Sequence, residues 1–94
     1  MFDPIESHRL HVFHAVAETG SVAKAAGLLC LTRSALSHAL KSLEQDLGCS
    51  LFHRSARKLE ISEAGKKLLP QATQILEAMH SARLSLCVED KPKL

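Results

Sequence analysis

Apolar residues recur with a helical period along most of the chain, and the breaks between these repeats separate four helical segments. The first repeat predicts a helix over residues 4–19, which Gly20 would end in a left-handed conformation. Asp3 is expected to cap its start, with Pro4 at the first helical position and Glu6 completing a capping box. The stripe expected to be buried consists of Leu10, Phe13, Val16 and Ala17.

Residues 22–41 are predicted to form two short helices joined by a tight turn. Ser21 is expected to cap the first helix, in which the small Ala25 and Ala26 allow another helix to approach closely. Thr32 is expected to cap the second helix. Four leucines at a spacing of 4-3-4 would hold one face of this second helix against the core: Leu36, Leu40, Leu43 and Leu47.

The second of these helices, predicted over about 33–47 with Gly48 after it, has a polar face opposite the leucines. Its members are Arg33, Ser34, Ser37, His38 and Lys41. Acidic residues would be favoured near a helix start, yet this face has no carboxylate before Glu44. Such donors suit the phosphates and base edges of a DNA major groove. The alternative is the ordinary solvated face of an amphipathic helix.

Residues 52–61 are predicted to form two very short strands around a basic turn, because Leu59 and Ile61 alternate with polar residues. Such a hairpin beside a helix-turn-helix would be a wing. Its basic residues are expected to meet phosphates or a minor groove, and they are Arg54, Arg57 and Lys58. An ordinary solvated hairpin is the alternative.

A long helix is predicted over residues 63–88, with Ser62 as its N-cap. Its apolar residues follow a coiled-coil spacing of 4-3-4-3-4, namely Leu68, Ala72, Ile75, Met79, Ala82 and Leu86. At 1.5 Å per residue it would be about 37 Å long, too long to lie wholly against so small a domain. We therefore expect these residues to form a dimer interface, although the spacing alone allows four chains as well as two. Residues 89–94 are expected to fray.

Composition supports one small domain that binds a duplex. The 94 residues are 46% hydrophobic but include only three Phe and no Trp or Tyr, which disfavours stacking on single-stranded nucleic acid. The formal net charge is +2, and residues 33–67 hold seven Lys and Arg against four acids. The positive charge thus coincides with the expected DNA-facing helix and wing.

Other chemistry is not indicated by the sequence. The three cysteines form no C-x-x-C pair, and we expect buried thiols in a cytoplasmic protein at Cys30, Cys49 and Cys87. His8, His11 and His14 lie three apart, but no nearby carboxylate or Cys completes a metal site. Neither a membrane span nor a signal sequence is recognisable. No catalytic spacing stands out, so we expect no enzyme, cofactor or small-molecule effector site.

Residues from about Leu10 to Leu76 resemble the N-terminal DNA-binding domain of LysR-type transcriptional regulators. The matching positions are Leu10, Phe13, Val16, Gly20, Ser21, Ala25, Ala26, Leu29, Ser34, Ala35, Leu36, Ser37, Leu43, Glu44, Leu47, Gly48, Leu51, Phe52, Arg54, Ala64 and Gly65. The resemblance implies a mainly α fold. A winged helix-turn-helix domain over 1–62, with a three-helix core and a two-stranded wing, would precede a long dimerisation linker helix over 63–88.

The resemblance also implies which residues contact DNA. From the helix these would be Thr32, Arg33, Ser34, Ser37, His38 and Lys41, and Arg54 would meet a phosphate near the wing. Arg33 stands where the family usually has Gln, and an arginine can read guanine N7 and O6 bidentately. Family members normally continue into an effector-binding domain of roughly 200 residues, which we do not expect within this chain.

Two functions follow from these observations. The first is sequence-specific binding of double-stranded DNA by a bacterial LysR-type transcriptional regulator, as a homodimer on an inverted repeat. The alternative is a winged-helix protein-interaction module that pairs through the long helix and modulates another regulator.

Overall fold

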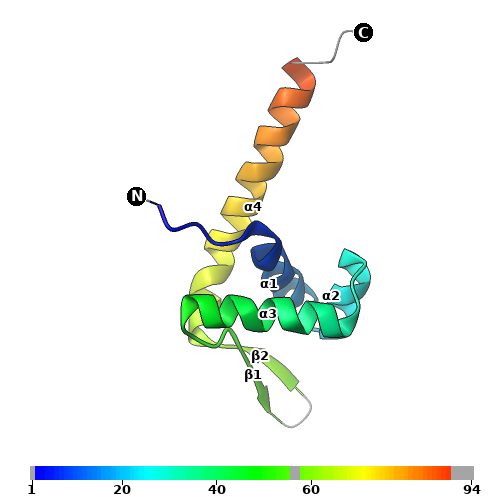
Figure 1. Cartoon of the computed structure of the whole chain (residues 1–94), viewed down its shortest axis with the longest axis vertical. Coiled ribbons are helices and arrows are strands. Elements are labelled where there is room, and N and C mark those ends of the chain that lie inside the picture. Colours follow the sequence, from blue (N-terminus) through cyan, green and yellow to red (C-terminus); the bar gives the residue numbers. More distant parts are fainter. Residues whose placement is uncertain (1, 56–57, 90–94) are drawn as a thin grey trace.

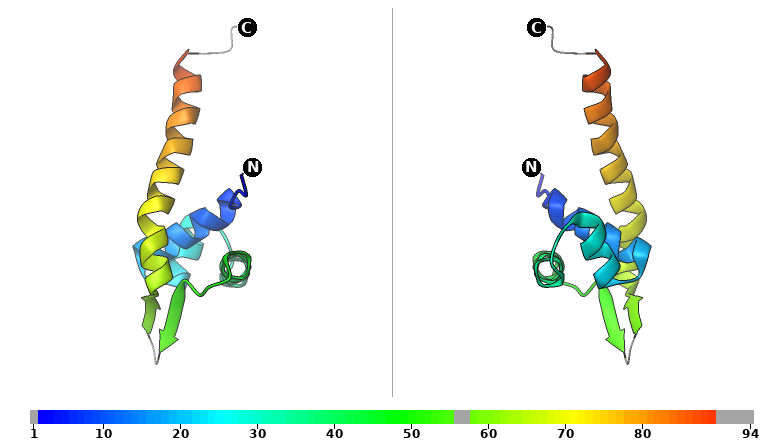
Figure 2. Two further views of the ribbon diagram at one scale, coloured as in Figure 1. Left: turned by 90° about the vertical axis from the view of Figure 1, so that its left-hand side faces the viewer. Right: turned by 90° about the vertical axis from the view of Figure 1, so that its right-hand side faces the viewer.

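The computed structural model describes residues 2–55 and 58–89. Its elements are α1 (Ser7–Thr19), α2 (Val22–Leu29), α3 (Arg33–Leu47), β1 (Phe52–Ser55), β2 (Lys58–Ile61) and α4 (Glu63–Glu89). The hairpin and the free end of α4 point in opposite directions from the three-helix cluster (Figure 1). α1 lies between α3 and α4, and packs against both (Figure 2). The predicted mainly α fold, a three-helix core with a two-stranded wing and a long last helix, is confirmed.

α1 begins three residues later than predicted. Glu6 is the N-cap with φ −67° and ψ 123°, and its carboxylate accepts a hydrogen bond from the Arg9 backbone N–H at 2.8 Å. The predicted start with Asp3 as the cap is therefore wrong, because Glu6 caps the helix itself. Ile5, directly before the cap, packs against the core and fixes the approach of the chain. Gly20 ends α1 in the left-handed region, as predicted.

The caps predicted for α2 and α3 are confirmed. The Ser21 hydroxyl accepts from the Lys24 backbone N–H at 3.1 Å, and the Thr32 hydroxyl accepts from that of Ala35 at 3.0 Å. Gly48 ends α3 with φ 76°. These local hydrogen bonds fix both ends of α3, so the positions of its polar residues follow from its sequence.

The cysteines are exposed, so the prediction of buried thiols is wrong. The physical reason is their place at or near helix ends. Cys30 is the C-cap of α2 with φ 58°, and Cys49 directly follows the C-cap of α3. Cys87 lies in the exposed last part of α4.

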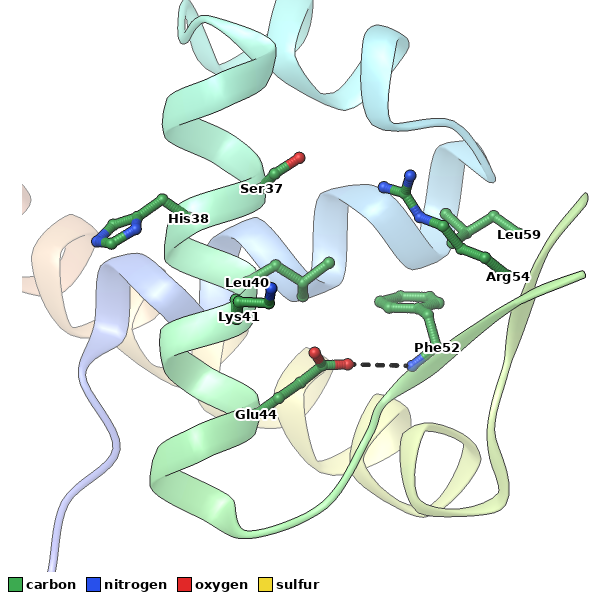
Figure 3. Close-up of a pocket in the computed structure, with 8 residues that line it drawn as sticks. All are labelled: Ser37, His38, Leu40, Lys41, Glu44, Phe52, Arg54 and Leu59. Carbon is green, nitrogen blue, oxygen red and sulfur yellow. Dashed lines mark hydrogen bonds between the residues drawn. The ribbon is translucent and has the colours of Figure 1, made fainter.

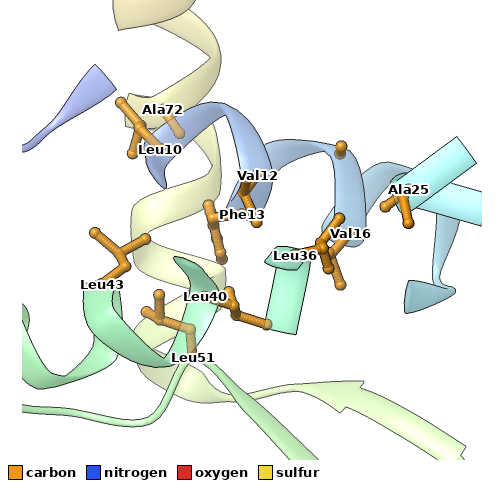
Figure 4. Close-up of a cluster of buried hydrophobic side chains, with 12 residues drawn as sticks. Leu10, Val12, Phe13, Val16, Ala25, Leu36, Leu40, Leu43, Leu51 and Ala72 are labelled. Carbon is orange, nitrogen blue, oxygen red and sulfur yellow. The ribbon is translucent and has the colours of Figure 1, made fainter. Parts of the chain in front are cut away.

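The core forms where α1, α2, α3 and the start of α4 meet (Figure 4). Its largest fully buried side chains are Phe13, Leu10, Leu36, Leu43, Leu51, Val12 and Val16. Val12 and Ala15 were not in the predicted stripe of α1; they are buried because α1 is packed by helices on more than one side. Ala17, which was in that stripe, is only half-buried.

The predicted wing is confirmed as an antiparallel pair in which Arg54 lies opposite Leu59. The Ser62 hydroxyl joins the wing to α4, because it donates to the Ser50 carbonyl at 2.7 Å and accepts from the Gly65 backbone N–H at 3.0 Å. A Cβ atom on Gly65 would overlap the Leu51 carbonyl oxygen and lie 2.6 Å from Ile61 Cγ1. The start of α4 therefore packs directly against the wing only because residue 65 is glycine.

α4 has two unlike halves. Near its start the side chain of Ala72 is fully buried and that of Leu68 is half-buried against the core. Every described side chain from Glu77 to Cys87 is exposed. Of the predicted tail at 89–94, Glu89 is still helical and residues 90–94 lie outside the described part of the chain. None of the helices within residues 2–55 and 58–89 has the length and apolarity to span a membrane.

Candidate nucleic-acid interface

The polar face of α3 lies on the surface of the domain, as its sequence spacing predicts. Leu36, Leu40 and Leu43 are buried beneath it. On the other side Arg33, Ser34, His38 and Lys41 are exposed, and Ser37 is half-buried. One face of α3 thus anchors the helix while the other carries hydrogen-bond donors to the solvent.

A groove of about 460 Å³ separates α3 from the wing. From α3 it is lined by Ser37, His38 and Lys41, and from β1 by Arg54 and Phe52 (Figure 3). Four of the predicted site residues, which are up to seventeen positions apart in sequence, therefore surround one concave surface. This surface can accept an anionic strand, since all its polar side chains except the Glu44 carboxylate are donors or cations.

Glu44 is the acidic residue of this groove, and its role was not predicted from the sequence. Its Oε2 accepts from the Leu51 backbone N–H at 2.7 Å and from that of Phe52 at 3.4 Å, the latter drawn in Figure 3. The carboxylate therefore ties the first residues of the wing to α3. The available signal was an isolated acid on an otherwise cationic face.

The N-terminal end of α3 forms a second part of the candidate interface. Thr32, Arg33 and Ser34 are exposed there and do not line the groove beside the wing. The Thr32 oxygen accepts the capping hydrogen bond, which leaves its hydroxyl proton available to donate. The first turn of α3 contains no acid, so the helix dipole presents uncompensated positive potential at this end.

Two of the predicted DNA contacts, Arg54 and Lys58, lie on the described strands of the hairpin. Arg54 is exposed on β1, and Lys58 is exposed at the start of β2. Arg57 lies outside the described residues. Within residues 2–55 and 58–89 the ion pairs are His14 with Glu18 and Lys66 with Glu63, so the cations of α3 and the wing have no described acidic partner.

The predicted dimer seam on α4 is only partly accessible. Ile75, Met79 and Leu86 are 41%, 48% and 65% exposed, and Ala82 is exposed beside them. Ala72 is wrong as an interface residue, because the chain's own core covers its side chain completely. Leu68 packs against the same core and is half-buried, so it offers a partner only part of its surface.

The sequence profile described as "Bacterial regulatory helix-turn-helix protein, lysR family" matches residues 7–66, from the start of α1 into the start of α4. The chain belongs to this family. Its lysR-type domain therefore contains α3, both strands of the wing and the groove between them. Two positions that match the family pattern hold the wing in place. Gly65 lets α4 pack against the wing, and Glu44 ties the wing to α3.

Relatives of the lysR-type chain include proteins named as transcriptional regulators. The HTH-type transcriptional regulator YofA of Bacillus subtilis (strain 168) is 38% identical over 89 residues, which are 95% of this chain and 31% of YofA. The chain thus spans about a third of the length of that relative.

Two solved structures of DNA-binding domains in complex with DNA share the fold. The BenM domain with catB site 1 DNA has a TM-score of 0.87 and 27% identity, covering 94% of this chain and 99% of that one. The CbnR domain with DNA has a TM-score of 0.77 and 38% identity, covering 88% of this chain and 97% of that one.

Proposed function

We propose that this chain binds double-stranded DNA in a sequence-specific manner, as the DNA-binding part of a bacterial transcriptional regulator of the cytoplasm. The observation that carries the proposal is the groove in which Ser37, His38, Lys41 and Arg54 converge from α3 and the wing. The likeness to the BenM and CbnR domains, which are described in complex with DNA, supports it.

In the proposed complex the exposed face of α3 enters the major groove, which is wide enough to admit a helix. Arg33 at its first position would read a base edge, since its guanidinium has no described acidic partner. Thr32 and Ser34 would donate to bases or phosphates from the same end, and His38 would do so from the groove beside the wing. These contacts would provide the sequence preference.

The groove beside the wing would hold the DNA backbone. Lys41, Ser37 and Arg54 present donors on its two walls, and Lys58 and Arg57 would extend these contacts along the hairpin. The single carboxylate in the groove already accepts backbone N–H groups, which reduces its repulsion of a phosphate. Binding should weaken steeply as salt is raised, because counterions are released from each neutralised phosphate.

Two copies would pair through the accessible part of the α4 seam, at Ile75, Met79, Ala82 and Leu86, with Leu68 at its edge. The exposed apolar side chains support this proposal, since they gain burial only from a partner outside the described chain. A two-fold axis would then place two copies of α3 about one DNA turn, ~34 Å, or a multiple of it apart, on an inverted repeat.

Selection of duplexes from a random pool, followed by fluorescence anisotropy on the enriched duplex and a scrambled one, tests the proposal. We expect an enriched inverted repeat that is bound at least about 1,000-fold more tightly than the scrambled duplex. Raising the salt concentration should weaken binding to both. Equally weak binding to every duplex would overturn the proposal and favour the protein-interaction module instead.

A further inference from the structure

Four of the six histidines of the chain line one groove between α1 and α4. His8, His11 and His14 lie on α1, and His80 faces them from α4. The groove has a volume of about 1010 Å³. None of these histidines belongs to the candidate DNA interface.

The apolar part of this groove's wall continues the dimer seam. Leu76, Met79, Ala82 and Leu86 of α4 all line it, and the last three are seam residues. Because the same side chains line the groove and form the exposed seam, a second copy that covers the seam also covers the groove. A two-fold axis would bring two identical histidine-lined grooves into one isologous interface.

We propose that this histidine-lined groove makes the pairing of two chains pH-dependent, with dimers at neutral pH that separate when the imidazoles are protonated in mild acid. The inference rests on the proposed dimerisation through α4. Its occupant is α4 of a second copy of this chain, and its trigger is the uptake of protons by His8, His11 and His80.

The charges around the groove favour this direction. Glu77 and Arg83 of α4 line the groove with opposite charges, so it is close to neutral while the imidazoles are uncharged. His14 lies 3.9 Å from the carboxylate of Glu18, so a proton gained there would be matched by a neighbouring negative charge. His14 should therefore contribute least. Protonation of the other three would place like charges in both copies of the groove.

The sign of the effect follows from desolvation. Seating an apolar helix over an imidazole removes the ring from water and disfavours its charged form. The separated chains therefore bind more protons than the dimer, and the dimer loses stability as the pH falls. Each additional proton taken up on separation weakens the dimer about tenfold per pH unit, within the pH range where the separated chains are protonated and the dimer is not.

Sedimentation equilibrium of the chain without DNA, at about pH 7.5 and about pH 5.5, tests the inference. For the native chain we expect the dimer dissociation constant to rise at least about tenfold at the lower pH. The variant His8→Gln/His11→Gln/His80→Gln should change less than about threefold. The control His38→Gln/His53→Gln alters the same residue type at exposed positions outside the groove and should behave like the native chain. Far-UV circular dichroism at both pH values checks that each chain stays folded.

A second variant keeps the inference open to refutation if the triple variant fails to fold. His80→Arg places a permanent charge in the groove and should raise the dissociation constant at about pH 7.5 by at least about tenfold. A native dimer that is equally tight at both pH values would overturn the inference and leave the proposed dimerisation standing. A chain that is monomeric at both would overturn both.

Discussion

α3 and α4 have the same spacing of apolar residues but use it in opposite ways. In α3 the side chains of Leu36, Leu40 and Leu43 are at most 8% exposed. In α4 the seam residues Met79 and Leu86 are 48% and 65% exposed. α3 buries its apolar stripe within the chain, whereas the outer half of α4 exposes its stripe to the solvent.

The difference shows that a helical repeat of apolar residues specifies a buried face without specifying which molecule buries it. α3 packs against α1 and α2, so its stripe meets the core at once. α4 leaves the core after its first turns. We therefore propose different roles for the exposed faces of the two helices: the donors of α3 would bind DNA, and the apolar seam of α4 would bind a second copy.

The largest effect is expected on the free energy of unfolding, from a substitution in the buried stripe of α3. Leu36→Ala should lower the free energy of unfolding by about 2–5 kcal/mol, because it opens a cavity at a fully buried position. Leu86→Ala removes the same atoms from an exposed position and should change it by less than about 0.5 kcal/mol. Urea unfolding at a protein concentration low enough to keep the chain monomeric measures both. Similar losses for the two variants would show that α4 is packed within the chain.

A charge introduced into the exposed seam should weaken dimerisation. Met79→Glu should raise the dimer dissociation constant at least about 100-fold, about 2.7 kcal/mol, because the carboxylate would be desolvated in the interface. Leu84 is 50% exposed on the same helix but lies off the seam, so Leu84→Glu should change the constant less than about threefold. Analytical ultracentrifugation near neutral pH compares the two, and equal weakening by both would place the interface elsewhere.

Two substitutions on the donor face of α3 should affect DNA binding in different ways, one through its sequence specificity and the other through its general affinity. Arg33→Ala is expected to lose about 1–3 kcal/mol of discrimination at one base pair, while Lys41→Ala weakens binding to all duplexes and flattens the salt dependence. Neither variant should change the dimer dissociation constant. Anisotropy titrations against a panel of single-base variants of the selected site provide the measurement. Unchanged relative affinities in Arg33→Ala would remove its base-reading role.

The smallest effect concerns the contact that holds the wing to α3. Glu44→Gln should lower the free energy of unfolding by about 1 kcal/mol, since charge-assisted hydrogen bonds to the Leu51 and Phe52 backbone N–H groups are weakened. Its DNA affinity should fall although a negative charge is removed, because the wing is less firmly placed. Chemical unfolding and anisotropy are the two readouts.

Asp46→Asn is the matched control for Glu44→Gln. It removes the same charge from an exposed position of α3 that does not line the groove. Its DNA affinity should stay equal or rise slightly, because the net charge becomes more positive. If both variants bound DNA more tightly, Glu44 would act through its charge alone and the positioning role would be wrong.

Local signals in the sequence determined the start of α2, both ends of α3 and the place of the wing. Ser21, Thr32 and Gly48 act within four residues of their own positions, so their hydrogen bonds and φ angles could be predicted without the fold. The same holds for the separation of leucines from donors on α3. The family resemblance, which the profile match over residues 7–66 confirms, also depends on such short-range patterns.

The tertiary structure alone decided the features that depend on contacts between distant segments. The core covers Ala72, and the Glu44 carboxylate binds backbone N–H groups seven and eight residues away. Four histidines meet in one groove only because α4 passes α1. A repeat in the sequence fixes which side of a helix is apolar, but the neighbour that covers it is set by how the whole chain folds.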